Sequence, residues 1–153
     1  MIDIKNTERG YLVGIGGIGM SALARYFIKG GYTVAGYDRT ETSITSSLSG
    51  EGCLISYVDD ENILPQHFRN QAKRDQTIVI YTPAIPVSNK ILSFFRNNNY
   101  RIFKRSEILG EISKHTDTLA VAGTHGKTTV STMLAHILKQ SHVDCSAFLG
   151  GIS

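Results

Sequence analysis

The segment GTHGKTT at residues 123–129 combines the residue types that bind a nucleotide phosphate. Its glycines let backbone N–H groups approach an anion, Lys127 can reach the β and γ oxygens, and the Thr128 hydroxyl can hold Mg²⁺. An apolar strand pattern precedes the loop and a helical pattern follows it. Its two glycines, Gly123 and Gly126, stand closer together than in the common P-loop pattern, which has four residues between them.

A second glycine loop, GIGGIG at residues 14–19, fits the pattern G-x-G-x-x-G. It follows the apolar run YLVGI and opens the helical pattern MSALARYFIKGG, so a pyrophosphate could bind at the helix start. Asp38 ends the next predicted strand, where dinucleotide enzymes place an acid that binds a ribose hydroxyl. The motif does not separate NAD from FAD or from a UDP-sugar, and the same glycines would also fit a tight turn without a ligand.

The remaining pattern indicates the elements that must position these loops. Buried strands are expected at residues 11–15, 32–38, 54–57, 77–82 and 101–103. Helices are expected at residues 19–29, 42–52, 88–98 and 106–113. Strand, glycine loop, helix and strand in this order form a right-handed βαβ unit. The predicted fold class is therefore α/β, a Rossmann-like parallel sheet with helices on both faces.

The pattern restarts after residue 115, with a strand at 118–123, a helix at 130–140 and a strand at 145–151. Residues 1–115 are therefore predicted to form the first domain. Residues 116–153 are predicted to begin a P-loop ATPase domain of the α/β class. A lone strand–helix–strand cannot close a core of its own, so we expect the chain to be a piece of a longer protein.

The composition excludes several classes of protein. The formal charge is only +3, and no run of basic residues suggests binding to nucleic acid. No apolar run is long enough to span a membrane, and the N-terminus lacks a signal peptide, so a cytoplasmic protein is expected. Cys53 and Cys145 form no CxxC pair and are predicted to be buried, reduced thiols. Met20 and Met133 are predicted to lie in a core.

Five stretches together resemble one family. GIGGIGMSALA, GYD, YTPAIP, KRSEILGEI and AVAGTHGKTT are similar to the Mur ligases of bacterial peptidoglycan synthesis, over residues 10–153. The compact G-T-x-G-K-T loop is this family's form of the P-loop. The resemblance implies a Rossmann-like domain for a UDP-sugar, a central ATPase domain and a C-terminal domain for an amino acid, of which the chain would hold the first and the start of the second.

The resemblance also implies which residues bind the two nucleotides. The UDP-sugar would be bound by Gly14, Gly16, Gly17, Ile18, Gly19, Met20, Ser21, Asp38, Thr82, Pro83, Ala84, Ile85 and Arg105. ATP would be bound by Gly123, Thr124, His125, Gly126, Lys127, Thr128 and Thr129. Lys127 would be the catalytic residue and Thr128 a ligand of Mg²⁺. His125 is expected to face the ligand rather than to catalyse.

The implied reaction is ATP-dependent amide formation in cell-wall synthesis, on which cell shape and division depend. The lactyl carboxylate of UDP-N-acetylmuramic acid would become an acyl phosphate, which the amine of L-alanine would attack. The histidine in GTHGKTT and the MSALA stretch favour this alanine-adding reaction.

Two alternatives stay open. One is a ligase that recycles murein tripeptide onto the same UDP-sugar. The other is an NAD-dependent oxidoreductase, which would leave GTHGKTT unexplained. We expect the chain alone to bind the UDP-sugar without ligating.

Overall fold

The computed structural model describes residues 6–149 and contains one sheet of five parallel strands. The strands are β1 (Arg9–Val13), β2 (Thr33–Tyr37), β3 (Leu54–Ser56), β4 (Thr77–Tyr81) and β5 (Arg101–Lys104). Their order across the sheet is β3-β2-β1-β4-β5, so β1 lies at the centre between β2 and β4. All five expected strands of the first domain are confirmed, and so is the α/β class.

The central strands have a continuous apolar sequence because both of their faces are covered. Leu12 and Ile80 face one core of the domain, whereas Tyr11 and Val79 face the other, and all four are almost completely buried. The register places the last residue of β1, Val13, beside Tyr37 of β2 and Tyr81 of β4. The three central strands therefore end at the same edge of the sheet.

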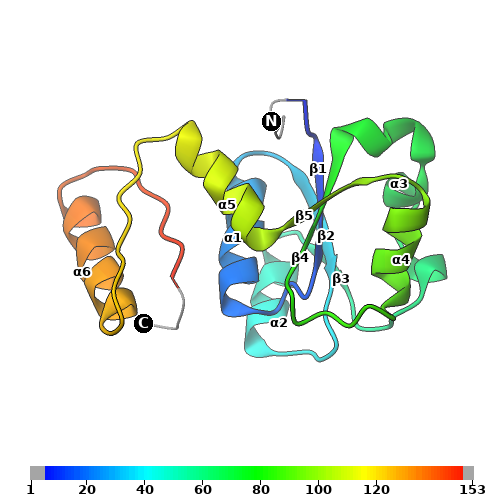
Figure 1. Cartoon of the computed structure of the whole chain (residues 1–153), viewed down its shortest axis with the longest axis horizontal. Helices are drawn as coiled ribbons and strands as arrows, with labels where there is room; N and C mark the ends of the chain where they lie inside the picture. The colour runs from blue at the N-terminus through cyan, green and yellow to red at the C-terminus, as the bar shows by residue number, and fades with distance from the viewer. Residues whose placement is uncertain (1–5, 150–153) are drawn as a thin grey trace.

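Helices cover both faces of the sheet, as predicted (Figure 1). One face carries α1 (Ile18–Lys29), α2 (Ser43–Gly50) and α5 (Arg105–Lys114). The other carries α3 (Gln66–Arg69) and α4 (Lys90–Asn97), together with the 3-10 turns η1 (Glu61–Ile63) and η2 (Gln71–Gln76). In the part of the chain that the structure describes, no helix is long and apolar enough to cross a membrane.

Local signals in the sequence account for the helix boundaries. At α2, Thr42 and Thr45 form a reciprocal cap, in which each side chain accepts from the backbone N–H of the other residue. At α4, the Asn89 side chain accepts from the N–H of Leu92 at 2.8 Å. α1 ends at Lys29 with Gly30 as its C-cap, and Gly31 follows with a φ of +82°, a value that glycine adopts without strain.

The last part of the chain differs from the expectation. Residues 127–140 do form a helix, α6 (Lys127–Gln140), but the expected strand at 118–123 is irregular, and so are residues 145–149. Residues 150 and 151 of the other expected strand lie outside the described residues. A β-strand needs a neighbouring strand for its backbone hydrogen bonds, and none of the described strands runs beside these segments.

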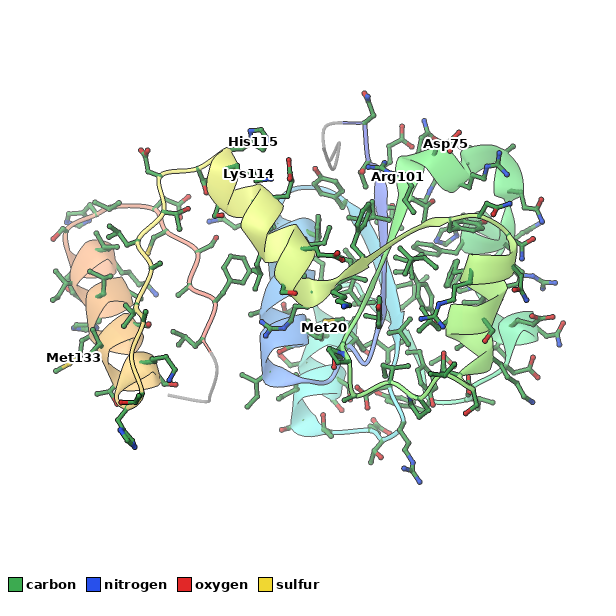
Figure 2. All side chains as sticks on the ribbon, in the orientation of Figure 1. Met20, Asp75, Arg101, Lys114, His115 and Met133 are labelled. Carbon is green, nitrogen blue, oxygen red and sulfur yellow. The ribbon has the colours of Figure 1, made fainter. Side chains whose placement is uncertain are left out.

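Burial in this part is also lower than expected. α6 has no buried residue, and Met133 is 62% exposed, so the prediction of a core methionine is wrong there although Met20 is buried as expected. Cys145 is exposed and Cys53 is buried, so only one of the two thiols lies where it was predicted. Figure 2 shows Met133 pointing away from the sheet, whereas Met20 lies beside it. The apolar pattern of α6 alone does not bury it.

Candidate nucleotide site

The first glycine loop lies at the switch point of the sheet. From β1 the chain proceeds to β2 and β3 on one side, and later to β4 and β5 on the other. The loops that follow β1 and β4 therefore leave the same edge in opposite directions. In open α/β sheets this is the place where ligands bind. The structure brings the GIGGIG loop and the TPAI stretch together here.

Gly14 and Thr82 show how closely these two loops approach. Gly14 has a φ of +86°, and the N–H groups of Gly14 and Ile15 both donate to the Tyr37 carbonyl, at 2.7 and 3.0 Å. A Cβ atom on Gly14 would lie 2.9 Å from the Thr82 methyl and 3.1 Å from Ile85. Position 14 requires glycine for its backbone conformation and for the space that its neighbours leave.

Asp38 braces the loop directly. Its Oδ2 atom accepts from the N–H of Gly16 at 2.7 Å, and Oδ1 lies 3.4 Å from the N–H of Thr40. A Cβ atom on Gly16 would lie 2.8 Å from the same Oδ2 atom. The carboxylate thus fixes the middle of the glycine loop, and this contact is additional to the ribose contact that the sequence suggested.

The first turn of α1 presents free backbone donors. The first N–H with a bond back along the chain is that of Ser21, which donates to the Gly17 carbonyl at 2.8 Å. The N–H groups of residues 18–20 precede this bond, and no acceptor for them is found among residues 6–149. The Met20 side chain is buried in the core, so position 20 can meet a ligand only through its backbone. The Ser21 hydroxyl donates to the Ile18 carbonyl at 2.9 Å.

Arg105 places a positive charge at this turn. It is the first residue of α5, and a Cβ atom on Gly19 would lie only 2.8 Å from its Nη1 atom. The guanidinium therefore lies against the start of α1. Among the described residues no carboxylate lies within ion-pair distance of it. A half-buried arginine beside the positive end of a helix dipole creates a site for an anion.

The TPAI stretch forms the other wall of the site. The Thr82 hydroxyl accepts from the N–H of Ala84 at 3.1 Å, and the Thr82 carbonyl accepts from the N–H of Ile85 at 3.1 Å. The Thr82 side chain is thus occupied in shaping a turn. Pro83 and Ala84 are exposed at the top of this turn and available for contact with a ligand.

Sequence reasoning did not identify Thr45 as part of the site. Thr45 is buried, and its methyl would lie 2.9 Å from a Cβ atom on Gly16, so the start of α2 closes one side of the loop. The T-x-x-T spacing of residues 42 and 45, placed just after Asp38, is the signal that could have found it. Tyr37 points into the opposite core, where burial, with Asp59 and Asp38 nearby, raises the pKa of its phenol.

The second glycine loop has the backbone geometry of a phosphate cradle. Gly126 has a φ of +77° and precedes α6, whose first bond back along the chain runs from the N–H of Val130 to the Gly126 carbonyl at 2.9 Å. The N–H groups of residues 127–129 have no acceptor in the described structure. The Lys127 ammonium donates to the carbonyls of Gly123 and Thr124, at 2.6 and 3.3 Å. These backbone and ammonium donors fit a bound phosphate.

The remaining residues of this loop are open to solvent. Thr124, His125 and Thr129 are exposed, and Thr128 is half-buried. The structure holds no metal that would test the expected Mg²⁺ role of Thr128. No cluster of three acidic, histidine or cysteine side chains that could hold a metal occurs within residues 6–149.

The two loops belong to separate parts of the molecule. α6 stands apart from the sheet, and its N-terminus points to the same end of the molecule as that of α1 (Figure 1). The contacts between these parts include an ion pair of Lys29 with Asp144 at 2.9 Å and a ring contact of Tyr26 with Phe148 at 5.7 Å. The structure therefore assembles the first set of predicted residues into one site and leaves the second as an isolated loop.

Comparison with known protein families identifies the family to which the chain belongs. The model of the Mur ligase family, catalytic domain, matches residues 10–116. The chain belongs to the Mur ligase family. The matched residues contain the whole sheet from Gly10 onward, both loops of the first site and Arg105. The resemblance expected from the GIGGIG, TPAI and KRSEILGEI stretches is thereby confirmed.

Individual members of the Mur ligase family are similar over nearly the whole chain. The UDP-N-acetylmuramate–L-alanine ligase of Porphyromonas gingivalis is 55% identical over 146 residues, which are 95% of this chain and 31% of the relative. The crystal structure of UDP-N-acetylmuramate-alanine ligase from Thermotoga maritima matches with a TM-score of 0.81 and 33% identity, covering 95% of this chain and 32% of that one. A murein peptide ligase from Psychrobacter arcticus matches with a TM-score of 0.73 and 27% identity, covering 90% and 27%. The chain thus spans about a third of the length of these alanine ligases.

Proposed function

We propose that this chain is the UDP-sugar-binding part, with the P-loop, of an ATP-dependent ligase that joins L-alanine to UDP-N-acetylmuramic acid in peptidoglycan synthesis. Two lines support the proposal: membership of the Mur ligase family, and 55% identity to an alanine ligase over 95% of the chain. Such an enzyme takes soluble nucleotide substrates, so we place it in the cytoplasm. Its substrates would be the UDP-sugar, the amino acid and ATP, with no role for nucleic acid or membrane.

One observation carries the assignment of the UDP-sugar to the first loop. The Arg105 guanidinium and the free N–H groups of residues 18–20 meet at the first turn of α1. Together they would bind the pyrophosphate of the UDP-sugar, because both favour a compact negative charge. Asp38 and the exposed backbone of the Thr82 turn would then line the nucleoside side of the site.

The second loop would bind ATP. Lys127 would transfer its hydrogen bonds from the Gly123 and Thr124 carbonyls to phosphate oxygens, and the N–H groups of residues 127–129 would surround the phosphate. The Thr128 hydroxyl would hold Mg²⁺. ATP supplies the phosphoryl group that turns the lactyl carboxylate into an acyl phosphate, which gives the amine of alanine a good leaving group to displace. Lys127 would neutralise the charge that develops on the phosphate oxygens.

A ligase that attaches murein tripeptide to the same UDP-sugar is the second candidate, supported by the likeness to the Psychrobacter enzyme. The lower identity of that enzyme, 27% against 55%, favours the alanine-adding reaction. Assays of the full-length protein with L-alanine and with the tripeptide as competing amine substrates decide between the two.

Calorimetry of the 153-residue chain tests the UDP-sugar site. We expect UDP-N-acetylmuramic acid to bind and NADH not to bind. Arg105→Ala should weaken UDP-sugar binding about tenfold or more, because it removes charge-assisted hydrogen bonds worth about 1.5–3 kcal/mol. Lys104→Ala, which removes the exposed cation next in sequence, is the matched control and should change the affinity little. Binding of NADH alone, or equal effects of the two variants, would contradict the assignment.

The P-loop assignment needs the full-length protein. There, Lys127→Ala should abolish ligation and leave the affinity for the UDP-sugar nearly unchanged, because Lys127 belongs to the second loop. Calorimetry and a phosphate-release assay measure the two effects separately. Ligation that persists in this variant would show that Lys127 does not act on ATP.

A further inference from the structure

A basic hollow lies beside the starts of the strands, at the edge of the sheet opposite the candidate nucleotide site. Arg9, the first residue of β1, pairs with Thr33 and Thr77, which begin β2 and β4, and it lines the hollow together with residues of α3. The hollow has a volume of about 550 Å³. Its lining residues are Arg9, Gln66, His67, Arg69, Asn70 and Lys73. No acidic side chain is among them.

Two nitrogen atoms in the wall of this hollow are buried without a hydrogen-bond partner, Arg9 Nη1 and His67 Nε2. The Arg9 side chain is only 11% exposed, and its Nη2 atom makes one ion pair, with the exposed Glu8 at 3.4 Å. Buried polar atoms are normally satisfied, and leaving a charged donor without an acceptor costs stability. An acceptor oxygen that reached Arg9 Nη1 would remove this cost.

The rim adds further positive charge. Arg69 and Lys73 are exposed, and Arg69 Nη1 donates to the Asn62 carbonyl at 3.3 Å. Burial and the neighbouring Arg9 lower the pKa of His67, which favours its neutral imidazole. An anion in the hollow would oppose the effect of Arg9, because a negative charge favours the imidazolium ion.

We propose that this hollow binds a phosphate group, either as inorganic phosphate or as a phosphate monoester. Arginine, histidine and lysine residues that line one hollow can supply several donors to the oxygens of a dianion. A flat polyanion surface would instead need its cations spread along a face, and here the cationic residues line one hollow. The hollow and the first turn of α1 lie at opposite edges of the sheet, so the phosphate would bind independently of the UDP-sugar.

Proton NMR of the His67 ring tests the proposal on the 153-residue chain. The His67 resonance is assigned with a His67→Gln variant and followed over pH at constant ionic strength, in chloride and in increasing phosphate. We expect phosphate to move the His67 titration to higher pH, with saturation. Phosphate at either glycine loop leaves this signal unchanged because His67 lies at the opposite edge. A titration that does not move, or that moves without saturating, overturns the proposal.

Variants that remove a charge at the rim distinguish specific phosphate binding in the hollow from attraction of phosphate by the net charge of the protein. Lys73→Gln and Arg69→Gln should each weaken phosphate binding at His67 about three- to fivefold, the effect expected for an exposed charge. Lys139→Gln removes an exposed lysine of α6 and should have no effect. An equal loss with Lys139→Gln would mean that net charge alone attracts the ion, and the proposal would fail.

Competing ligands identify the source of the phosphate group. If glycerol 3-phosphate shifts the His67 titration at lower concentration than inorganic phosphate, the hollow recognises monoesters. The reverse order assigns it to the free ion, and either result supports the site. Tighter binding of heparin than of both phosphates, with loss in the same rim variants, would make the hollow part of a polyanion surface and contradict the proposal.

Discussion

The two glycine loops have similar local sequences and very different surroundings. In each, glycines precede a helix whose first N–H groups are free. At the first loop, a Cβ atom on Gly14, Gly16 or Gly19 would lie within 3 Å of a side chain from another element. At the second, a Cβ atom on Gly126 would have nothing within 4 Å. The first loop is held by its neighbours, whereas the second depends on its own backbone.

This difference shows that a binding loop has two requirements, a backbone conformation and a charged partner, which arise in different ways. The backbone conformation that frees the helix N–H groups is local, because the φ of Gly126 and the start of α6 suffice for it. The position of a charged partner such as Arg105 is not local, because it comes from an element far along the chain. A loop can form a phosphate-binding backbone by itself, whereas a charged side chain such as Arg105 reaches the loop only when helices pack on the sheet.

We call the part of the chain that contains the first glycine loop the first region and the part that contains the second loop the second region. The largest expected contrast between these two regions is in thiol reactivity. Burial raises the pKa of Cys53 to about 12, with Glu51 adding to the effect, whereas Cys145 is exposed. Because only the thiolate reacts, at pH 8 Cys53 should be alkylated about a thousandfold more slowly than an ordinary thiol. Mass spectrometry after iodoacetamide treatment measures both sites. Modification of the two cysteines at similar rates would show that the first region opens as readily as the second.

The second contrast is in packing. Phe27 of α1 is fully buried, so Phe27→Ala should lower the free energy of unfolding by about 3–5 kcal/mol. Ile137 of α6 is 59% exposed. Ile137→Ala should therefore stay within about 0.5 kcal/mol of the parent chain. Urea unfolding measured by far-ultraviolet circular dichroism gives both values. A large loss with Ile137→Ala would mean that α6 is packed in solution.

The smallest contrast concerns the glycines themselves. Gly16→Ala places a methyl against Asp38 and Thr45 and should lower the free energy of unfolding of the first region by about 1–3 kcal/mol. Gly126→Ala should cost about 1–2 kcal/mol of backbone strain that is confined to the start of α6.

Tyrosine fluorescence distinguishes these two costs, because all seven tyrosines precede residue 101 and none belongs to α6. The urea midpoint seen by tyrosine fluorescence should fall in Gly16→Ala and stay unchanged in Gly126→Ala. Equal shifts in the two variants would show that the regions unfold as one unit and that the contrast between the loops is wrong.

Much of the first domain could be predicted from the sequence because its signals are local and repeated. A parallel strand buried on both faces has a continuous apolar run, and each such run here is followed by a recognisable break. The prediction of a strand at 118–123 was wrong because an apolar run forms a strand only when another strand lies beside it. For the same reason Met133 was placed in a core that the described residues do not form.

The candidate site was predictable in part. Asp38 and the two glycine motifs were recognisable from spacing, and Arg105 was found through resemblance to a family. Thr45 was missed, because the T-x-x-T spacing predicts only a helix cap, and the contact of Thr45 with Gly16 joins elements that are far apart in sequence. The bond from Gly16 to Asp38 was missed as well, because the motif suggested a ribose as the partner of that carboxylate.

The sequence by itself determined the order of the elements, the α/β class and the two phosphate-type loops, because each depends on residues close together in the chain. The tertiary structure alone decided which charges meet. It placed Arg105 against Gly19, set Asp38 against Gly16, and left Arg9 Nη1 and His67 Nε2 buried without a hydrogen-bond partner at the opposite edge. These contacts join residues that are distant in sequence, and their distances follow only from the way the helices pack on the sheet.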